Sequence, residues 1–159
     1  MLIAGCDYST HNIDVIFLDL DTNKAEWRRW ELTGQDAFDR TRTIRETMPP
    51  RTWWHDQGIV ALGLEHPAGK HGTGTLMRVQ GAILACIPTS LLVQPWAPAA
   101  WRKAVGLKGN ASKEDVYTWA IRRINEQPNA WPLAVPHDAT DAYCIARATS
   151  SRIREGEPA

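Results

Sequence analysis

Four acidic residues stand where their side chains could act together. Asp7 follows the apolar run "MLIAGC", and Glu65 follows the apolar run "GIVALGL". Strands this apolar are typical of the interior of an α/β sheet, and such sheets bind ligands at the carboxyl ends of their strands. Asp138 and Asp141 are three residues apart in "PHDATDAYCIA", a spacing that places both on one face of a helix. The apolar stripe that follows them predicts that this face points into the protein.

Carboxylates gathered in this way repel one another and lose hydration, so we expect them to hold a cation. A set of four acids with no Cys or His among its members favours hard cations such as Mg²⁺ or Mn²⁺. Two such ions about 4 Å apart can clamp a phosphodiester. The pattern therefore predicts metal-assisted hydrolysis of a nucleic-acid backbone.

Some of these acids could have a structural role instead of binding a metal. Asp7 could open the turn formed by residues 8–10, or cap the element that follows. Asp138 could serve only the dipole of its helix, because acids are favoured in a first turn. Asp141 lies past that turn on the face that points inward, so the dipole does not account for it.

The charge balance excludes a general attraction to nucleic acid. The chain has 159 residues, with 18 Lys and Arg against 18 Asp and Glu, and a formal net charge of +0. Any binding of nucleic acid must therefore come from a local basic patch. The length suits one domain with a substantial core.

Cysteine usage and the first residues bear on location. Cys6, Cys86 and Cys144 are odd in number and form no close-spaced pair, which favours a reducing compartment and argues against a Cys-based zinc site. The first apolar run is too short, and lacks the basic flank, for a signal peptide or a membrane span. We expect a cytoplasmic protein with no membrane partner.

Hydrophobic periodicity predicts strands and helices that would position the acids. Three strands come first, one that ends at Asp7 and two at residues 13–21 and 25–32, as an antiparallel meander whose third member is the more exposed. A helix over residues 35–47 ends at Pro49-Pro50. Then follow a buried strand at 58–65, a helix at 75–86, a strand at 90–95, a short helix at 97–106, a helix at 110–124, and a last helix from about residue 138.

The motifs "AGCDYS", "LGLEHP", "VGLKGNASKEDV" and "HDATDAYCIA" occur in this order along nearly the whole chain. In this they resemble the RuvC-type Holliday-junction resolvases of the ribonuclease H-like superfamily. The resemblance implies an α/β, ribonuclease H-like fold: a mixed five-stranded sheet, made of a three-strand antiparallel meander plus two parallel strands, flanked by helices. It implies a single nuclease domain over residues 1–152 and a charged, flexible tail over 153–159.

The resemblance also assigns roles to individual residues. Asp7, Glu65, Asp138 and Asp141 match the family's catalytic, metal-binding acids, which implies two Mg²⁺ or Mn²⁺ ions in each active site. Lys113, in "ASKEDV", matches the catalytic lysine that family members carry near the scissile phosphate. No small-molecule cofactor is implied.

Substrate and assembly are implied in the same way. A similar protein would be a crossover junction endodeoxyribonuclease that binds four-way or otherwise branched DNA. It would work as a homodimer that nicks opposing strands symmetrically. The predicted helix Thr75–Cys86 takes the position of the family's dimer helix, although packing on its own sheet explains one of its faces equally well.

One segment departs from the family. Relatives can carry a base-stacking aromatic residue a few positions after the second acid, but "EHPAGKHGTGT" contains none. Lys70 and His71 lie there among glycines and could approach a phosphate instead. Arg102, Lys103 and Lys108 predict a further phosphate-contacting patch ahead of the catalytic lysine. A solvated loop and solubilising charge would look the same in the sequence.

Three other functions fit parts of this pattern. A ribonuclease H-like nuclease could act on an RNA–DNA hybrid or on structured RNA with the same metals. A non-catalytic module could grip branched nucleic acid and leave the cutting to a partner, although such a module has no need of a costly acidic cluster. An actin-like ATPase needs two such domains, and this chain has room for one.

Overall fold

A five-stranded mixed sheet forms the centre of the protein. The computed structural model describes residues 1–67, 73–126 and 135–156. The strands are β1 (Leu2–Tyr8), β2 (Asn12–Asp19), β3 (Ala25–Glu31), β4 (Ile59–Glu65) and β5 (Leu92–Trp96). They lie in the order β3-β2-β1-β4-β5, with an antiparallel meander on one side and parallel pairs β1/β4 and β4/β5 on the other. The predicted fold class is confirmed.

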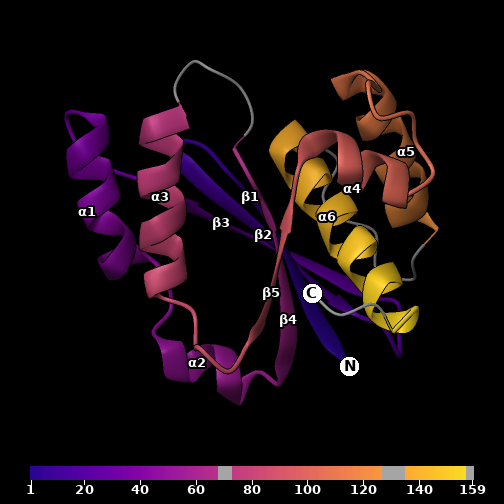
Figure 1. Ribbon diagram of the computed structural model, residues 1–159, viewed down its shortest axis with the longest axis horizontal. Helices are drawn as coiled ribbons and strands as arrows, with labels where there is room; N and C mark the ends of the chain where they lie inside the picture. The colour runs from indigo at the N-terminus through magenta and orange to yellow at the C-terminus, as the bar shows by residue number, and fades with distance from the viewer. Residues whose placement is uncertain (68–72, 127–134, 157–159) are drawn as a thin grey trace.

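Helices cover both faces of the sheet (Figure 1). They are α1 (Ala37–Thr47), α2 (Arg51–Asp56), α3 (Thr73–Ala85), α4 (Pro98–Ala104), α5 (Lys113–Asn125) and α6 (His137–Arg154). The first three lie on one side of the sheet and the last three on the other, so each face has its own hydrophobic core. No described helix has the length and apolarity needed to cross a membrane.

The short helix α2 was not predicted from the sequence. Pro49-Pro50 does end the preceding helix region, but Pro50 is also the N-cap of α2. Proline suits a helix start because the first N–H groups of a helix have no intrahelical partner. Trp54 anchors this helix and is fully buried in the core beneath α1, α2 and α3.

Two glycines let α6 approach the sheet closely. A methyl group on Gly5 would lie 2.3 Å from the carbonyl oxygen of Ala142, and one on Gly63 would lie 2.1 Å from Oγ1 of Thr149. No larger residue fits at either position without moving the helix. Trp96 adds a hydrogen bond from Nε1 to Oγ1 of Thr149 at 2.9 Å. The backbone of α6 is thereby held directly against β1 and β4.

Candidate functional site

The topology places the predicted acids at one end of the sheet. Asp7 is the second-to-last residue of β1, and Glu65 is the last residue of β4. Because these strands are parallel neighbours, their carboxyl ends meet. Asp138 and Asp141 lie in the first turns of α6, which packs across β1, β2 and β4. As predicted, the helix face that carries Asp141 continues into the core.

The electrostatics show that the four carboxylates share one environment. Burial raises the pKa of Asp7 well above its ordinary value, and the charges of Glu65, Asp141 and Asp138 raise it further. The backbone N–H of Tyr8 donates to Oδ1 of Asp7 at 2.9 Å and lowers this pKa. Such mutual repulsion arises only between charges that lie close together.

Asp141 is the most buried of the acids on α6, with 7% of its surface exposed. Burial and then the charge of Glu65 raise the pKa of Asp141 to about 7. Lys113 and Arg102 pull this pKa in the opposite direction. Both cations therefore face the carboxylates, although each comes from a different element.

Glu65 is held by a residue that the sequence did not reveal. The indole Nε1 of Trp101 donates to Oε2 of Glu65 at 2.9 Å, and Trp101 itself is fully buried. Burial raises the pKa of Glu65, while this hydrogen bond and the charges of Arg102 and Lys113 counteract the rise. Helix α4 thus positions one acid of the site with Trp101 and faces it with the next residue, Arg102.

Asp138 is held by two residues of the meander. Nδ2 of Asn12 donates to its Oδ2 at 3.3 Å, and the guanidinium of Arg29 lies 3.7 Å from the same oxygen. Both residues also bind Asp14, a fully buried acid on β2. Arg29 makes two hydrogen bonds to Asp14, at 3.0 and 2.9 Å, and Trp27 donates to it at 2.8 Å.

The register explains how this network reaches the site. Asp14 lies opposite Asp7 across β1 and β2, and opposite Arg29 across β2 and β3. Residues directly opposite in antiparallel strands share a face of the sheet, so these three form one row on the α6 side. Asp14 stands inside the apolar run "IDVIFLDLD", and an acid in a buried strand indicates that it has polar partners. Which residues these are depends on the strand register, which the sequence does not state.

The carboxylates fit a divalent cation chemically, although they are not drawn together around one. Within the residues that the structure describes, no three His, Cys, Asp or Glu side chains form a ready metal-binding group. Burial, and then the charges of the neighbouring acids, raises the pKa of both Asp7 and Asp141. Oxygen-only donors with unbalanced negative charge are the chemistry that Mg²⁺ and Mn²⁺ require.

The predicted basic residues fall into three groups. Arg102 and Lys113 face the acids, and a capping box between Ser112 and Asp115 fixes the start of the helix that carries Lys113. Lys108 acts electrostatically on Asp115, and the Lys103 side chain packs against Gly109. Lys70 and His71 lie outside the described residues.

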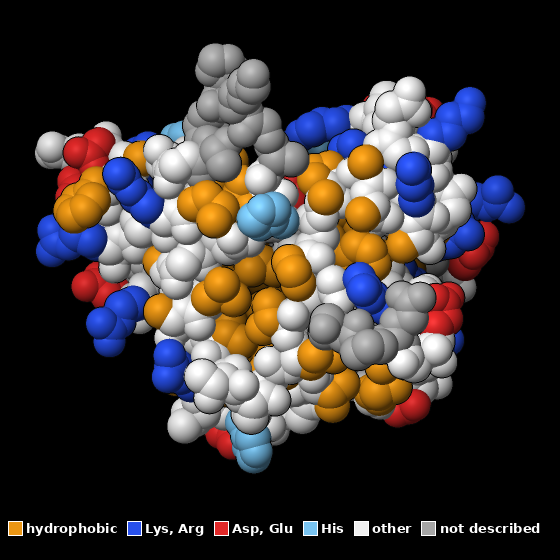
Figure 2. Space-filling model, viewed as in Figure 1, with side chains coloured by type: hydrophobic (Ala, Val, Ile, Leu, Met, Phe, Trp, Pro, Cys, Tyr) orange, Lys and Arg blue, Asp and Glu red, His pale blue; other side chains and the backbone are white. Residues whose placement is uncertain are grey.

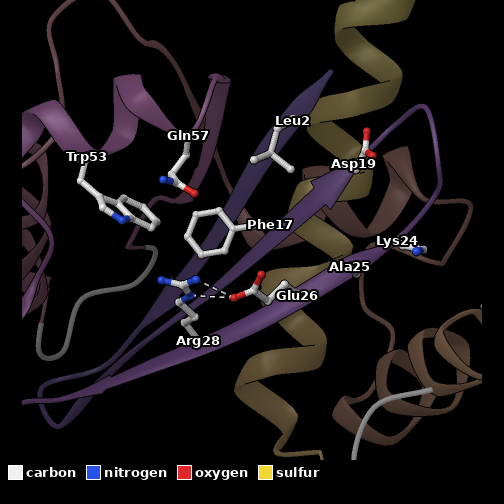
Figure 3. Close-up of a pocket in the computed structure, with 9 residues that line it drawn as sticks. All are labelled: Leu2, Phe17, Asp19, Lys24, Ala25, Glu26, Arg28, Trp53 and Gln57. Carbon is white, nitrogen blue, oxygen red and sulfur yellow. Dashed lines mark hydrogen bonds and ion pairs between the residues drawn. The ribbon is translucent and has the colours of Figure 1, made fainter. Parts of the chain in front are cut away.

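A separate hollow of about 290 Å³ lies at the opposite end of the sheet (Figure 3). Three of its charged groups are already paired: Arg28 bonds to Glu26 at 2.7 Å, and Asp19 accepts from Thr22 at 2.6 Å. The Arg28 guanidinium also lies 5.7 Å from the Phe17 ring and 5.2 Å from the Trp53 ring. This hollow takes no part in the chemistry of the acids.

The strand order, the helices on both faces and the acids at the ends of β1 and β4 and the start of α6 define a ribonuclease H-like fold. The sequence matches no protein-family profile and no curated protein. Among solved structures, the fold is that of the RuvC-type resolvases. Thermus thermophilus RuvC aligns with a TM-score of 0.73 and 20% identity, over 98% of this chain and 97% of that one.

Two similar structures contain DNA. Thermus thermophilus RuvC in complex with a Holliday junction substrate has a TM-score of 0.71 and 18% identity, over 98% of this chain and 96% of that one. Fowlpox virus resolvase with its substrate Holliday junction DNA has a TM-score of 0.62 and 12% identity, over 96% and 99%. The RuvC-like fold expected from the motifs is confirmed.

Proposed function

We propose that this protein is a divalent-metal-dependent endonuclease that resolves four-way (Holliday) or other branched DNA junctions. The observation that carries the proposal is the group of four mutually repelling carboxylates at the carboxyl end of the sheet, faced by Arg102 and Lys113. A structural role alone gives no reason to keep so much uncompensated charge in one place. The likeness in fold to junction resolvases supports branched DNA as the substrate.

In this proposal Asp7, Glu65, Asp138 and Asp141 hold two Mg²⁺ or Mn²⁺ ions. When bound, such ions stabilise the charge that develops on the phosphodiester and lower the pKa of the attacking water. The protein's own part is to hold the four carboxylates at one end of the sheet. Helix α6 does this for two of them through its tight packing on the sheet.

Neighbouring residues complete the arrangement. Trp101 holds Glu65 through one oxygen and leaves the other oxygen for a cation. Asn12 and Arg29 hold Asp138 in the same way. Lys113 brings positive charge to the scissile phosphate, where it stabilises the transition state without being consumed.

A homodimer follows from the same proposal, and α3 offers a suitable face. Met77 and Leu84 are seven residues apart on this helix, with 43% and 38% of their surfaces exposed. Gly74 and Gly81 alternate with them at three- and four-residue spacing, and a methyl group on either would meet nothing within 4 Å. This is the spacing of a helix–helix seam. Hydrophobic side chains also gather in the middle of the face shown in Figure 2.

Sedimentation or light scattering tests the dimer. We expect Met77→Glu with Leu84→Glu to give a monomer that still folds and no longer makes paired nicks. Phe38→Glu is the matched control, because this side chain is 63% exposed and belongs to a different helix, α1. A wild-type protein that is monomeric at micromolar concentration, with or without junction DNA, would refute the α3 interface.

Cleavage of a labelled synthetic four-way junction tests the activity, with Mg²⁺ or Mn²⁺ and with Asp7→Asn as the inactive control. Linear duplex and an RNA–DNA hybrid are assayed beside it. Paired symmetric nicks in the junction alone support a resolvase. Cutting of the hybrid instead keeps the mechanism and changes the substrate, while tight binding without any cutting makes the chain a non-catalytic binding module.

A further inference from the structure

Two hollows outside the acidic site meet at one stacked pair of side chains. One, of about 660 Å³, runs between the α4–α5 connection and α5, from Lys108 to Arg123. The other, of about 300 Å³, lies between the ends of α4, α5 and α6. Trp119 and Arg123 line both. We call the second hollow the arginine groove; it is lined by Ala104, Val105, Trp119, Arg123, Arg147, Ser150, Ser151 and Arg154.

Aromatic rings, and not carboxylates, hold the guanidinium groups of Arg123 and Arg147. Cζ of Arg123 lies 3.8 Å from the centre of the Trp119 ring. Nε of Arg147 donates to the Tyr143 hydroxyl at 3.0 Å, and its Cζ lies 5.5 Å from that ring. The two ring centres are 6.4 Å apart; Trp119 lines the groove, and Tyr143 is fully buried beneath Arg147. Stacking of this kind fixes a guanidinium while leaving its N–H fork open to a ligand.

The positive charge of the groove is not balanced locally. In the part of the chain that the structure describes, Arg123, Arg147 and Arg154 form no ion pair with a carboxylate. The adjacent Arg122 differs, because it pairs with Glu126 at 3.5 Å. In a chain whose net charge is zero, three unpaired arginines around one hollow are a local anion site.

The groove is suited to a phosphodiester backbone. Arginine forks bind phosphate oxygens in pairs, and serine hydroxyls commonly add to such contacts. Ser150 and Ser151 line the wall of this hollow, and the Ser151 hydroxyl donates to the carbonyl oxygen of Arg147 at 3.3 Å. The larger hollow leads back along α5 toward Lys108, and the same helix begins with Lys113, which faces the acids. Helix α5 thus carries Lys113 at its start, beside the acids, and Arg123 near its end, in the groove.

The length of α6 gives the distance between the acids and the arginine groove. Thirteen residues separate Asp141 from Arg154, which at 1.5 Å per residue is about 20 Å. A DNA strand carries one phosphate per 3.4 Å of helix axis, so about six base pairs span this distance. A duplex whose backbone is cut at the acids can thus reach the groove with one of its arms.

We propose that the arginine groove is a second phosphate-binding site, which grips a duplex arm of the junction about 20 Å from the cut. This inference rests on the proposed function and adds the location of an arm. Arg123, Arg147 and Arg154 bind the backbone without reading sequence. Their role is to hold the arm in register while the acids act on the branch point.

The test measures junction binding by Asp7→Asn protein, which does not cut, as a function of salt. Replacing Arg123, Arg147 and Arg154 together by Gln removes up to three phosphate contacts. We expect the slope of log K against log salt to become shallower by about 2 to 3, and affinity at about 0.1 M salt to fall at least about tenfold. Arg42→Gln, on α1, is the control and should change neither quantity.

Two further experiments make the result independent of folding defects in the triple variant. Arg154→Glu alters a single exposed side chain at the end of α6 and should weaken junction binding on its own. Hairpin-capped junctions with arms of about four base pairs lack the phosphates that would reach the groove. On these short junctions, the triple variant and its parent should bind alike.

The outcomes separate the two proposals. If the protein with an intact groove does not bind the junction, the proposed function fails and this inference fails with it. If that protein binds but the triple variant and Arg154→Glu match it in affinity and salt slope on long arms, the groove is not a DNA site. That second outcome would leave the nuclease proposal standing and would fit a groove that serves an acidic protein partner.

Discussion

Asp7 and Asp14 lie opposite each other across β1 and β2, yet their surroundings differ. Asp14 is fully buried and accepts hydrogen bonds from Arg29, Trp27 and Asn12. Asp7 receives one backbone N–H and otherwise meets like charges, which raise its pKa. The difference shows a division of labour along one row of the sheet. Asp14 stabilises the fold, whereas Asp7 keeps a charge repulsion that a bound cation or a proton would relieve.

The largest expected effect separates the two acids in catalysis. Asp7→Asn should lower the single-turnover rate of junction cleavage by about a thousandfold or more, because about 4 kcal/mol of transition-state stabilisation is lost with a metal ligand. Asp14→Asn, measured at a temperature where it is folded, should retain much more activity. Equal losses in the two variants would remove the distinction between them.

For stability we expect the opposite: Asp14→Asn should be more damaging than Asp7→Asn. Asp14→Asn leaves Arg29 beside Asp138 without its main partner, and we expect the free energy of unfolding to fall by about 3 kcal/mol, measured by urea titration. The double variant Asp14→Asn/Arg29→Gln should lose less than the sum of its single variants, because the pair is coupled. Strict additivity would contradict the network.

Cation binding sharpens the comparison further. A divalent ion at one hundred times its dissociation constant should stabilise the wild-type protein by about 2.7 kcal/mol, seen as a rise in Tm over protein kept in EDTA. Asp7→Asn should abolish most of this rise. Asp14→Asn should start from a lower Tm and keep the rise. A cation effect of equal size in Asp7→Asn would place the ion elsewhere.

The smallest effect is a dependence on pH in the metal-free protein. The pKa of Asp7 is raised and that of Asp141 is raised to about 7, whereas an unfolded chain titrates its carboxyl groups near about pH 4. Between these values the folded state binds more protons, so the free energy of unfolding falls as pH rises. Urea midpoints in EDTA should therefore be higher at pH 5 than at about pH 7.5. Asp7→Asn should flatten this fall, and an unchanged slope would count against the coupling.

Local sequence patterns were enough to predict many of the strands and helices and the four acids of the site. The apolar runs before Asp7 and Glu65 predicted buried strands, and the three-residue spacing of Asp138 and Asp141 predicted a shared helix face. These are properties of neighbouring residues, so no tertiary knowledge was needed. The α2 helix was missed because Pro50 both ends one element and caps the next.

The supporting contacts could not be predicted because they depend on register and docking. Arg29 reaches Asp14 only through the pairing of β2 with β3, and Trp101 reaches Glu65 only because α4 docks beside β4. The Trp119 and Arg123 pair is different. Its spacing of four residues on a helix was a local signal for stacking that the sequence already contained.

The glycine contacts between α6 and the sheet also bear on how the protein opens. Because Gly5 and Gly63 contribute no side chain, α6 packs closely on β1 and β4, and even a small separation would break these contacts. The amide hydrogens of these segments should therefore exchange with solvent as one cooperative unit, at a rate set by global unfolding. All four acids belong to that unit, two on α6 and two on β1 and β4. The site should therefore stay folded or unfold as a whole. A nuclease built in this way would not drift through half-assembled states as it warms.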